Sequence, residues 1–165
     1  MPVDLIVLHA ISLPAGQFSM QHVEALFIST LDISAHPSFA SLEGMRVAAH
    51  FVVDRDGQIT QFVPAGQRAW HAGASSWQGK AQCNDYSIGI EILGDEQTPF
   101  TTKQYRETAR LCRALMLRFP GMRPERIVGH QDVAPGRKWD PGKQWDWVHF
   151  RRSLAHIRNT EMNIR

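Results

Sequence analysis

The sequence predicts an α/β fold: a single domain with a mixed central β-sheet flanked by α-helices. Two observations carry this prediction. Segments with strand character alternate along the chain with segments of helical period, an order typical of sheets covered by helices. One pair of strands is separated only by the tight turn Asp54–Gly57, which predicts an antiparallel hairpin within the sheet. With 165 residues, 43% of them hydrophobic, the chain is expected to form one domain over residues 1–165.

Strand and helix signals follow one another at the start of the chain. The continuous apolar run Leu5–Leu8 predicts a strand that is buried on both faces. Ser19 is a suitable N-cap for a helix that places Val23 and Leu26 on its apolar face. Residues 31–46 show no periodicity and are expected to form a long loop, which in compact domains is usually functional or mobile.

The middle of the chain supplies the hairpin and a further strand. Residues 47–53 predict the first strand of the hairpin, and residues 58–63 alternate as its returning strand. Residues 66–86 are rich in Gly, Ser and Trp and are expected to be irregular. Residues 87–93 predict a buried strand that is apolar except at Glu91.

Helix signals dominate the last third. Thr101 and Gln104 form a capping box ahead of a periodic apolar segment, and Pro120–Gly121 is expected to end that helix. Residues 126–129 predict a short strand. A final helix is expected from about Asp146.

Charge, cysteine content and hydropathy narrow the class of protein. The formal net charge of +2 neither requires nor excludes nucleic acid, but no run of Lys or Arg could follow a phosphate backbone, so nucleic acid is not an expected partner. Cys83 and Cys112 form no CxxC pair, and Cys112 is expected in the core. No apolar run approaches the ~18 residues of a membrane span, and the first residues lack a basic leader, so the cytoplasm is the default compartment.

The densest chemistry lies in residues 130–142. His130, Lys138 and Asp140 occur there among prolines and glycines, which predicts a shaped loop rather than a helix or strand. Imidazole nitrogen and carboxylate oxygen are both zinc ligands, and a catalytic zinc keeps one of its four positions open. The best candidate for a third ligand is His9, which follows the first apolar run.

Each of these residues also has an ordinary structural alternative. His9 can be a buried structural histidine, and Asp140 can simply cap the turn before a proline. Glu91 can accept a proton from a metal-activated water, or it can face outward from an alternating strand. Lys138 can stabilise an oxyanion, or it can be a solvated surface lysine. The pattern alone does not choose between these alternatives.

A second candidate region is the loop that carries Trp70 and His71. Aromatic faces suit the apolar faces of sugars, so the loop can form a sugar-binding wall; packing within the loop explains it equally well. His50, within the first hairpin strand, is expected near the site or in the core rather than as a ligand.

These segments together resemble the amidase family that includes the cytoplasmic 1,6-anhydro-N-acetylmuramyl-L-alanine amidases of Gram-negative bacteria, phage lysozyme-type amidases and peptidoglycan recognition proteins. The resemblance covers nearly the whole chain in order and is specific to the anhydro-muropeptide branch. The matching segments are Val7–Pro14, Ala35–Phe39, Val47–Phe51, Arg55–Ile59, Arg68–Gly73, Cys83–Glu91 and Gly129–Gly142.

The resemblance implies a role for each candidate residue. It implies a zinc ion (Zn2+) held by His9, His130 and Asp140. It implies Glu91 as the general base and Lys138 as the stabiliser of the oxyanion. The implied reaction is hydrolysis of the amide between the lactyl group of anhydro-N-acetylmuramic acid and L-alanine of the stem peptide, in the recycling of peptidoglycan fragments.

The resemblance also implies how the substrate is held. Arg137 is placed to bind a carboxylate of the stem peptide, and Trp70 and His71 would border the sugar. The expected partner is a muropeptide, with no nucleic acid or membrane, and the protein is expected to be a cytoplasmic monomer. Two positions depart from the family pattern: Ala10 stands where Asn is common, and Trp139 stands where a smaller polar residue is expected.

Two rival functions remain open at this point. One is an amidase of the same chemistry that acts on intact cell wall, as a phage endolysin does. The other is a non-catalytic module that only binds muropeptides, which the presence of all three candidate ligands argues against.

Overall fold

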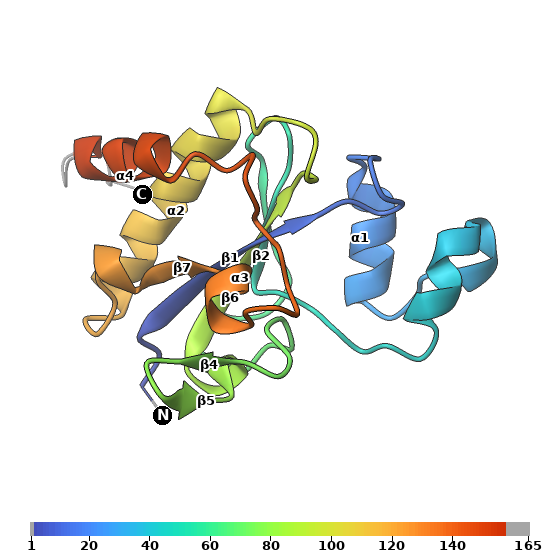
Figure 1. Ribbon diagram of the computed structural model, residues 1–165, viewed down its shortest axis with the longest axis horizontal. Coiled ribbons are helices and arrows are strands. Elements are labelled where there is room, and N and C mark those ends of the chain that lie inside the picture. The colour runs from blue at the N-terminus through green and yellow to red at the C-terminus, as the bar shows by residue number, and fades with distance from the viewer. Residues whose placement is uncertain (1, 158–165) are drawn as a thin grey trace.

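The computed structural model describes residues 2–157 and shows a mixed five-stranded sheet with helices on both faces (Figure 1). The strand order is β3-β2-β6-β1-β7, in which β2, β6, β1 and β7 are parallel and β3 is antiparallel to β2. The predicted fold class is therefore confirmed. The strands are β1 (Leu5–Ile11), β2 (Phe51–Val53), β3 (Ile59–Gln61), β6 (Ser87–Leu93) and β7 (Ile127–Gly129).

In the part of the chain that the structure describes, four α-helices and a small hairpin surround this sheet. In Figure 1, α2 and α4 lie together on one side, α3 and the hairpin β4–β5 lie on the other, and α1 lies at one end. The helices are α1 (Met20–Phe27), α2 (Thr102–Arg118), α3 (His130–Val133) and α4 (Trp147–His156). The hairpin strands are β4 (Ser76–Trp77) and β5 (Lys80–Ala81), and short 3-10 turns cover Ile33–Ala35, Pro37–Leu42, Cys83–Asp85 and Pro124–Arg126. None of the helices in residues 2–157 is long and apolar enough to cross a membrane.

The alternation of side chains along β6 separates the main core from the site. Ile88, Ile90 and Ile92 are fully buried in the cluster that α2 and α4 complete. Gly89 and Glu91 therefore point to the opposite face, because successive strand residues alternate between faces. Cys112, on α2, is fully buried in the same cluster as the isoleucines, as expected from its helical position.

The predicted caps and several boundaries are confirmed. The Ser19 side chain accepts a hydrogen bond at the start of α1, and Thr101 and Gln104 form the reciprocal capping box of α2. The strand predicted over residues 87–93 has the same bounds in the structure. The final helix is capped by Asp146, as expected.

Three expectations about local structure were wrong. Residues 47–50 are not part of β2: Ala48 instead pairs with Trp70 in an isolated bridge. Residues 31–46 are not a plain loop, because the side chains of Asp32 and His36 cap two 3-10 turns. Residues 130–133 form the single helical turn α3 before the punctuated loop begins, so the first proline of the segment ends a helix that is already formed.

Candidate metal centre

Strand register brings three candidate residues into one row. Gly129, the last residue of β7, pairs with Leu8 of β1, so His130 emerges beside His9. On the other side of β1, His9 is the direct register partner of Glu91 in β6. The strands are parallel, so all three side chains lie toward their carboxyl ends, where sites in such sheets commonly form.

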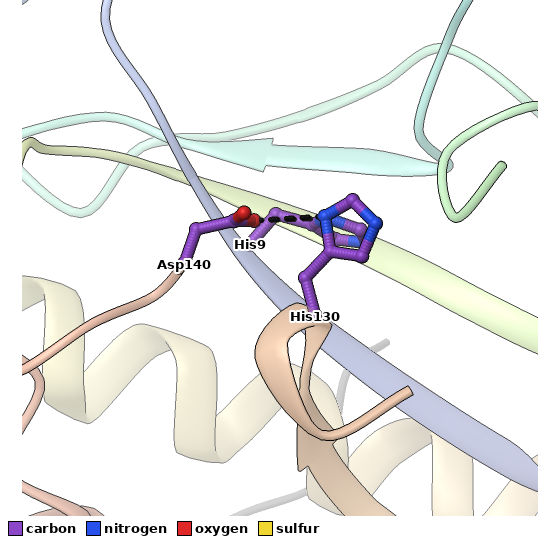
Figure 2. A group of neighbouring side chains, drawn as sticks. All are labelled: His9, His130 and Asp140. Atoms are coloured by element: carbon purple, nitrogen blue, oxygen red, sulfur yellow. Dashed lines mark hydrogen bonds and ion pairs between the residues drawn. The ribbon is translucent and has the colours of Figure 1, made fainter. Parts of the chain in front are cut away.

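The loop after α3 brings the fourth residue back to this row. The backbone N–H of Gln131 donates to the carbonyl oxygen of Asp140 at 2.9 Å, which closes the loop over ten residues. Figure 2 shows the Asp140 carboxylate pointing at the rings of His9 and His130. Asp140, predicted as a ligand or as a turn cap, therefore lies in the cluster.

The three side chains converge through one atom each. The Nδ1 atoms of His9 and His130 are 2.9 Å apart. Oδ2 of Asp140 lies 3.3 Å from Nδ1 of His9 and 3.0 Å from Nδ1 of His130. All three residues are buried, and their ligand atoms form a group that could hold a metal ion. Tetrahedral zinc with bonds of ~2.0–2.2 Å needs ligand atoms roughly 3.3 Å apart, so these residues fit the ion that the resemblance implies.

Burial and charge set the protonation of this group. Burial lowers the pKa of His9 to about 4, although the adjacent Asp140 opposes the shift. Burial works against ionisation of Asp140, but its contacts with His130 and His9 outweigh burial and hold the pKa of Asp140 well below its usual range. A neutral imidazole beside an ionised carboxylate is the state in which these groups bind a metal ion.

Glu91 adds a carboxyl group that the fold leaves without a hydrogen-bonding partner at one oxygen. Its Oε1 lies 4.0 Å from Nδ1 of His9, and its Oε2 is buried with no partner among the described residues. Burial raises the pKa of Glu91 well above its usual value, the charge of Asp140 adds to the shift, and Lys138 opposes it. A carboxyl group of this kind is suited to accept a proton near neutral pH.

His71 is held between His9 and β6. Its Nδ1 lies 2.9 Å from Nε2 of His9, and its Nε2 lies 3.2 Å from Oγ of Ser87. Both ring nitrogens are thus engaged, and His71 borders the cleft with the rest of its ring. Burial, followed by the neighbouring histidines, holds the pKa of His71 well below its usual value.

His50 is buried beside this group and is not one of the converging residues, as expected. Its Nδ1 accepts from the backbone N–H of Gly89 at 3.0 Å, and its Nε2 donates to the carbonyl oxygen of Gln67 at 2.9 Å. Sequence reasoning missed the contact between His71 and His9. The signal that could have revealed it is Gly89, because a glycine inside a buried strand often marks a close approach.

We expect Gly89→Ala to destabilise the protein by about 1–3 kcal/mol, the usual cost of overpacking a core. A Cβ at this position would stand 2.4 Å from Cγ of His71, so the ring must move. The matched control is Gly66→Ala, since a Cβ there meets nothing within 4 Å. Urea unfolding of the two variants measures the difference, and equal midpoints would show that His71 is not held in place by contact with Gly89.

A cleft opens from the convergent group to the surface. Lys138 lies on its rim together with the exposed Trp70 and Trp139. The Arg68 guanidinium covers the Trp70 ring at 3.7 Å, and Arg137 donates to the carbonyl oxygens of Ala72 and Ala74. The cleft is lined by Ala10, Ile11, Leu26, Phe27, Met45, Val47, Ala48, Ala49, Trp70, His71, Glu91, His130, Lys138, Trp139 and Asp140.

This fold and this group of side chains are typical of metal-dependent hydrolases: two imidazoles and a carboxylate converge beside a buried glutamate and a lysine. The model of the N-acetylmuramoyl-L-alanine amidase family matches residues 1–143. The chain is 46% identical over 159 residues to the 1,6-anhydro-N-acetylmuramyl-L-alanine amidase AmpD of Citrobacter freundii, covering 96% of this chain and 84% of the relative. The chain belongs to the N-acetylmuramoyl-L-alanine amidase family, which confirms the resemblance noted in the sequence.

Solved structures agree with this membership. A crystal structure of a selenomethionine derivative of AmpD has a TM-score of 0.90 and 45% identity to this chain, covering 93% of this chain and 86% of that one. The Escherichia coli amidase AmiD, solved with anhydro-N-acetylmuramic acid-L-Ala-D-γ-Glu-L-Lys as substrate, has a TM-score of 0.67 and 27% identity. The match covers 92% of this chain and 57% of the AmiD chain.

Proposed function

We propose that this protein is a zinc amidase that hydrolyses the bond between anhydro-N-acetylmuramic acid and L-alanine of the stem peptide, in the recycling of peptidoglycan fragments. The observation that carries the proposal is the group of three ligand atoms 2.9–3.3 Å apart, with a buried glutamate beside it. The similarity to AmpD over nearly the whole chain supports the substrate. In this proposal residues 1–165 act as one zinc amidase domain.

Zinc would be held by Nδ1 of His9, Nδ1 of His130 and a carboxylate oxygen of Asp140. When bound, zinc supplies Lewis acidity, which polarises a carbonyl and brings the pKa of water toward ~7. The low pKa of His9 and of Asp140 keeps both residues in their metal-binding forms at neutral pH.

Glu91 would move the proton of the reaction. Its raised pKa lets it take a proton from the attacking water and return it to the nitrogen of the leaving L-alanine. Lys138, on the rim of the same cleft, would place its ammonium group near the carbonyl oxygen as negative charge develops there. The positive charge of Lys138 also lowers the pKa of Glu91 and so favours its ionised form, the form that can accept a proton.

The rim would hold the two ends of the substrate. Trp70 presents a 59% exposed ring that the Arg68 guanidinium covers, and Trp70 and His71 would border the sugar. Arg137 would face a carboxylate of the stem peptide, with its guanidinium oriented by the backbone of Ala72 and Ala74. We propose a cytoplasmic monomer with a muropeptide as its partner, in line with the resemblance.

Product analysis tests the substrate directly. Zinc-loaded protein is mixed with anhydro-N-acetylmuramyl-tripeptide and, separately, with its non-anhydro counterpart, and the products are identified by mass spectrometry. We expect release of free tripeptide, with the anhydro substrate preferred. Equal cleavage of both would shift the substrate toward general peptidoglycan, and cleavage of neither, with zinc bound, would favour a binding module.

A further inference from the structure

A chain of hydrogen bonds runs away from the metal centre through His71. Nε2 of His9 meets Nδ1 of His71 at 2.9 Å, and Nε2 of His71 meets Oγ of Ser87 at 3.2 Å. The Ser87 hydroxyl in turn donates to the carbonyl oxygen of Cys83 at 2.6 Å. The chain thus ends on a backbone carbonyl, a group that can only accept hydrogen bonds.

The carbonyl group of Cys83 determines which atom is the donor and which the acceptor in each of these hydrogen bonds. Because the Ser87 proton points to Cys83, its oxygen must accept from Nε2–H of His71. A neutral imidazole carries one proton, so Nδ1 of His71 is an acceptor and takes the proton of His9 Nε2. His9 is then left with a free lone pair on Nδ1, the atom that faces His130 and Asp140.

We propose that His71 and Ser87 form a positioning relay that fixes the tautomer of His9 and thereby prepares the site for a divalent metal. The inference rests on the proposed function and deepens it, because it adds two residues that would hold a ligand in its binding form without touching the metal. Mutation of residues that orient a metal ligand in this way typically lowers metal affinity ~10–100-fold.

The tautomer of His130 is fixed in the same way, by a single hydrogen bond to a backbone carbonyl group. Its Nε2 lies 3.2 Å from the carbonyl oxygen of Ala72, which can only accept, so its Nδ1 also carries a lone pair. Two imidazole lone pairs and a carboxylate oxygen then converge within 2.9–3.3 Å. Three acceptors at such distances repel one another unless a cation lies between them.

The packing around the relay leaves His71 little freedom to break it. The ring lies against Gly89, where even a Cβ would approach to 2.4 Å. Ser87 is only 3% exposed, so water does not readily replace His71 as its partner. The relay is therefore a fixed part of the fold, in place before any metal arrives.

The test compares four variants of the full chain. His71→Leu removes the acceptor for Nε2–H of His9. His71→Asn keeps an amide oxygen near the position of Nδ1 and should restore that hydrogen bond. Ser87→Ala removes the acceptor for Nε2–H of His71, so the proton of His71 is no longer held on Nε2. The control is Ser75→Ala, because the Ser75 hydroxyl also binds backbone groups, at Gly73 and Cys83, but leads to no histidine.

Two measurements other than enzymatic activity test whether His71 and Ser87 fix the tautomer of His9. Competition with a chelator measures zinc affinity, which we expect to fall ~10–100-fold in His71→Leu, less in Ser87→Ala, and little in His71→Asn or the control. Nitrogen-15 chemical shifts of the histidine rings, recorded on metal-free protein, should place the proton of His71 and of His9 on Nε2. In Ser87→Ala the His71 tautomer should become mixed.

A proton on Nδ1 of His71 in the native protein would overturn the relay, as would unchanged zinc affinity in a folded His71→Leu variant. These results are independent of the proposed reaction. Protein that binds zinc through the relay but cleaves no muropeptide would refute the proposed function alone.

Discussion

We expect Asp140→Ala to abolish zinc retention and turnover together. The carboxylate lies 3.0–3.3 Å from both histidine nitrogens and is the only anion among the three proposed ligands. Two neutral imidazoles remain in the variant, so the loss in affinity should exceed the ~10–100-fold that removal of an orienting residue costs. The measurement is zinc content after dialysis, by elemental analysis, alongside hydrolysis of the anhydro substrate.

The control for this variant removes a carboxylate elsewhere. Asp56 is exposed and, within residues 2–157, its side chain pairs only with Lys103 on the surface, so Asp56→Ala should keep full zinc content and full activity. Full activity in Asp140→Ala would remove Asp140 from the site. Loss of zinc in Asp56→Ala as well would point to general instability and not to ligand loss.

We expect Glu91→Ala and Glu91→Gln to keep zinc but to lose activity by ~10²–10⁴-fold, the range for a general acid–base residue. Neither variant changes the three proposed ligands, and Oε1 of Glu91 lies 4.0 Å from Nδ1 of His9. The substitution should lower kcat, because proton transfer by Glu91 is needed for the reaction and not for substrate binding. Zinc content and steady-state kinetics distinguish loss of the metal from loss of the catalytic rate, and an unchanged kcat would exclude Glu91 as the base.

Metal-free Glu91→Gln protein offers a second measure of the same residue. The folded protein raises the pKa of Glu91, so it binds this proton more tightly than the unfolded chain does. Stability therefore falls as pH rises from the unfolded pKa of ~4.3 through the raised one. The glutamine variant lacks this fall and should be the more stable protein at neutral pH, with the difference vanishing near pH 4.

Much of the site could be predicted because its residues interrupt strong patterns. Glu91 is the one charged residue in an apolar strand, and His9 ends an apolar run, so both were visible without a structure. Asp140 and His130 were visible because prolines and glycines mark their loop. The register that joins these residues could not be predicted, since pairing of parallel strands depends on contacts between distant segments.

Other features of the fold and the site could not be predicted from patterns in the sequence. Residues 31–46 show no 3.6-residue period because their turns are 3-10 helices, yet Phe39 within them is fully buried. The relay through His71 depends on which nitrogen meets which partner, and no spacing rule carries that information. Residues 47–50 were assigned to a strand from their apolar character, whereas only an isolated bridge at Ala48 forms there.

The position of β1 in the middle of the sheet also determines when the site can exist during synthesis. His9 is synthesised 121 positions before its partner His130, and Asp140 follows later still. Until then β1 has no β7 to pair with, and the nascent chain carries an isolated histidine in an apolar segment. The metal site can therefore form only after Asp140 has been synthesised, so a bound ion stabilises the assembled site but cannot guide the folding steps that precede it.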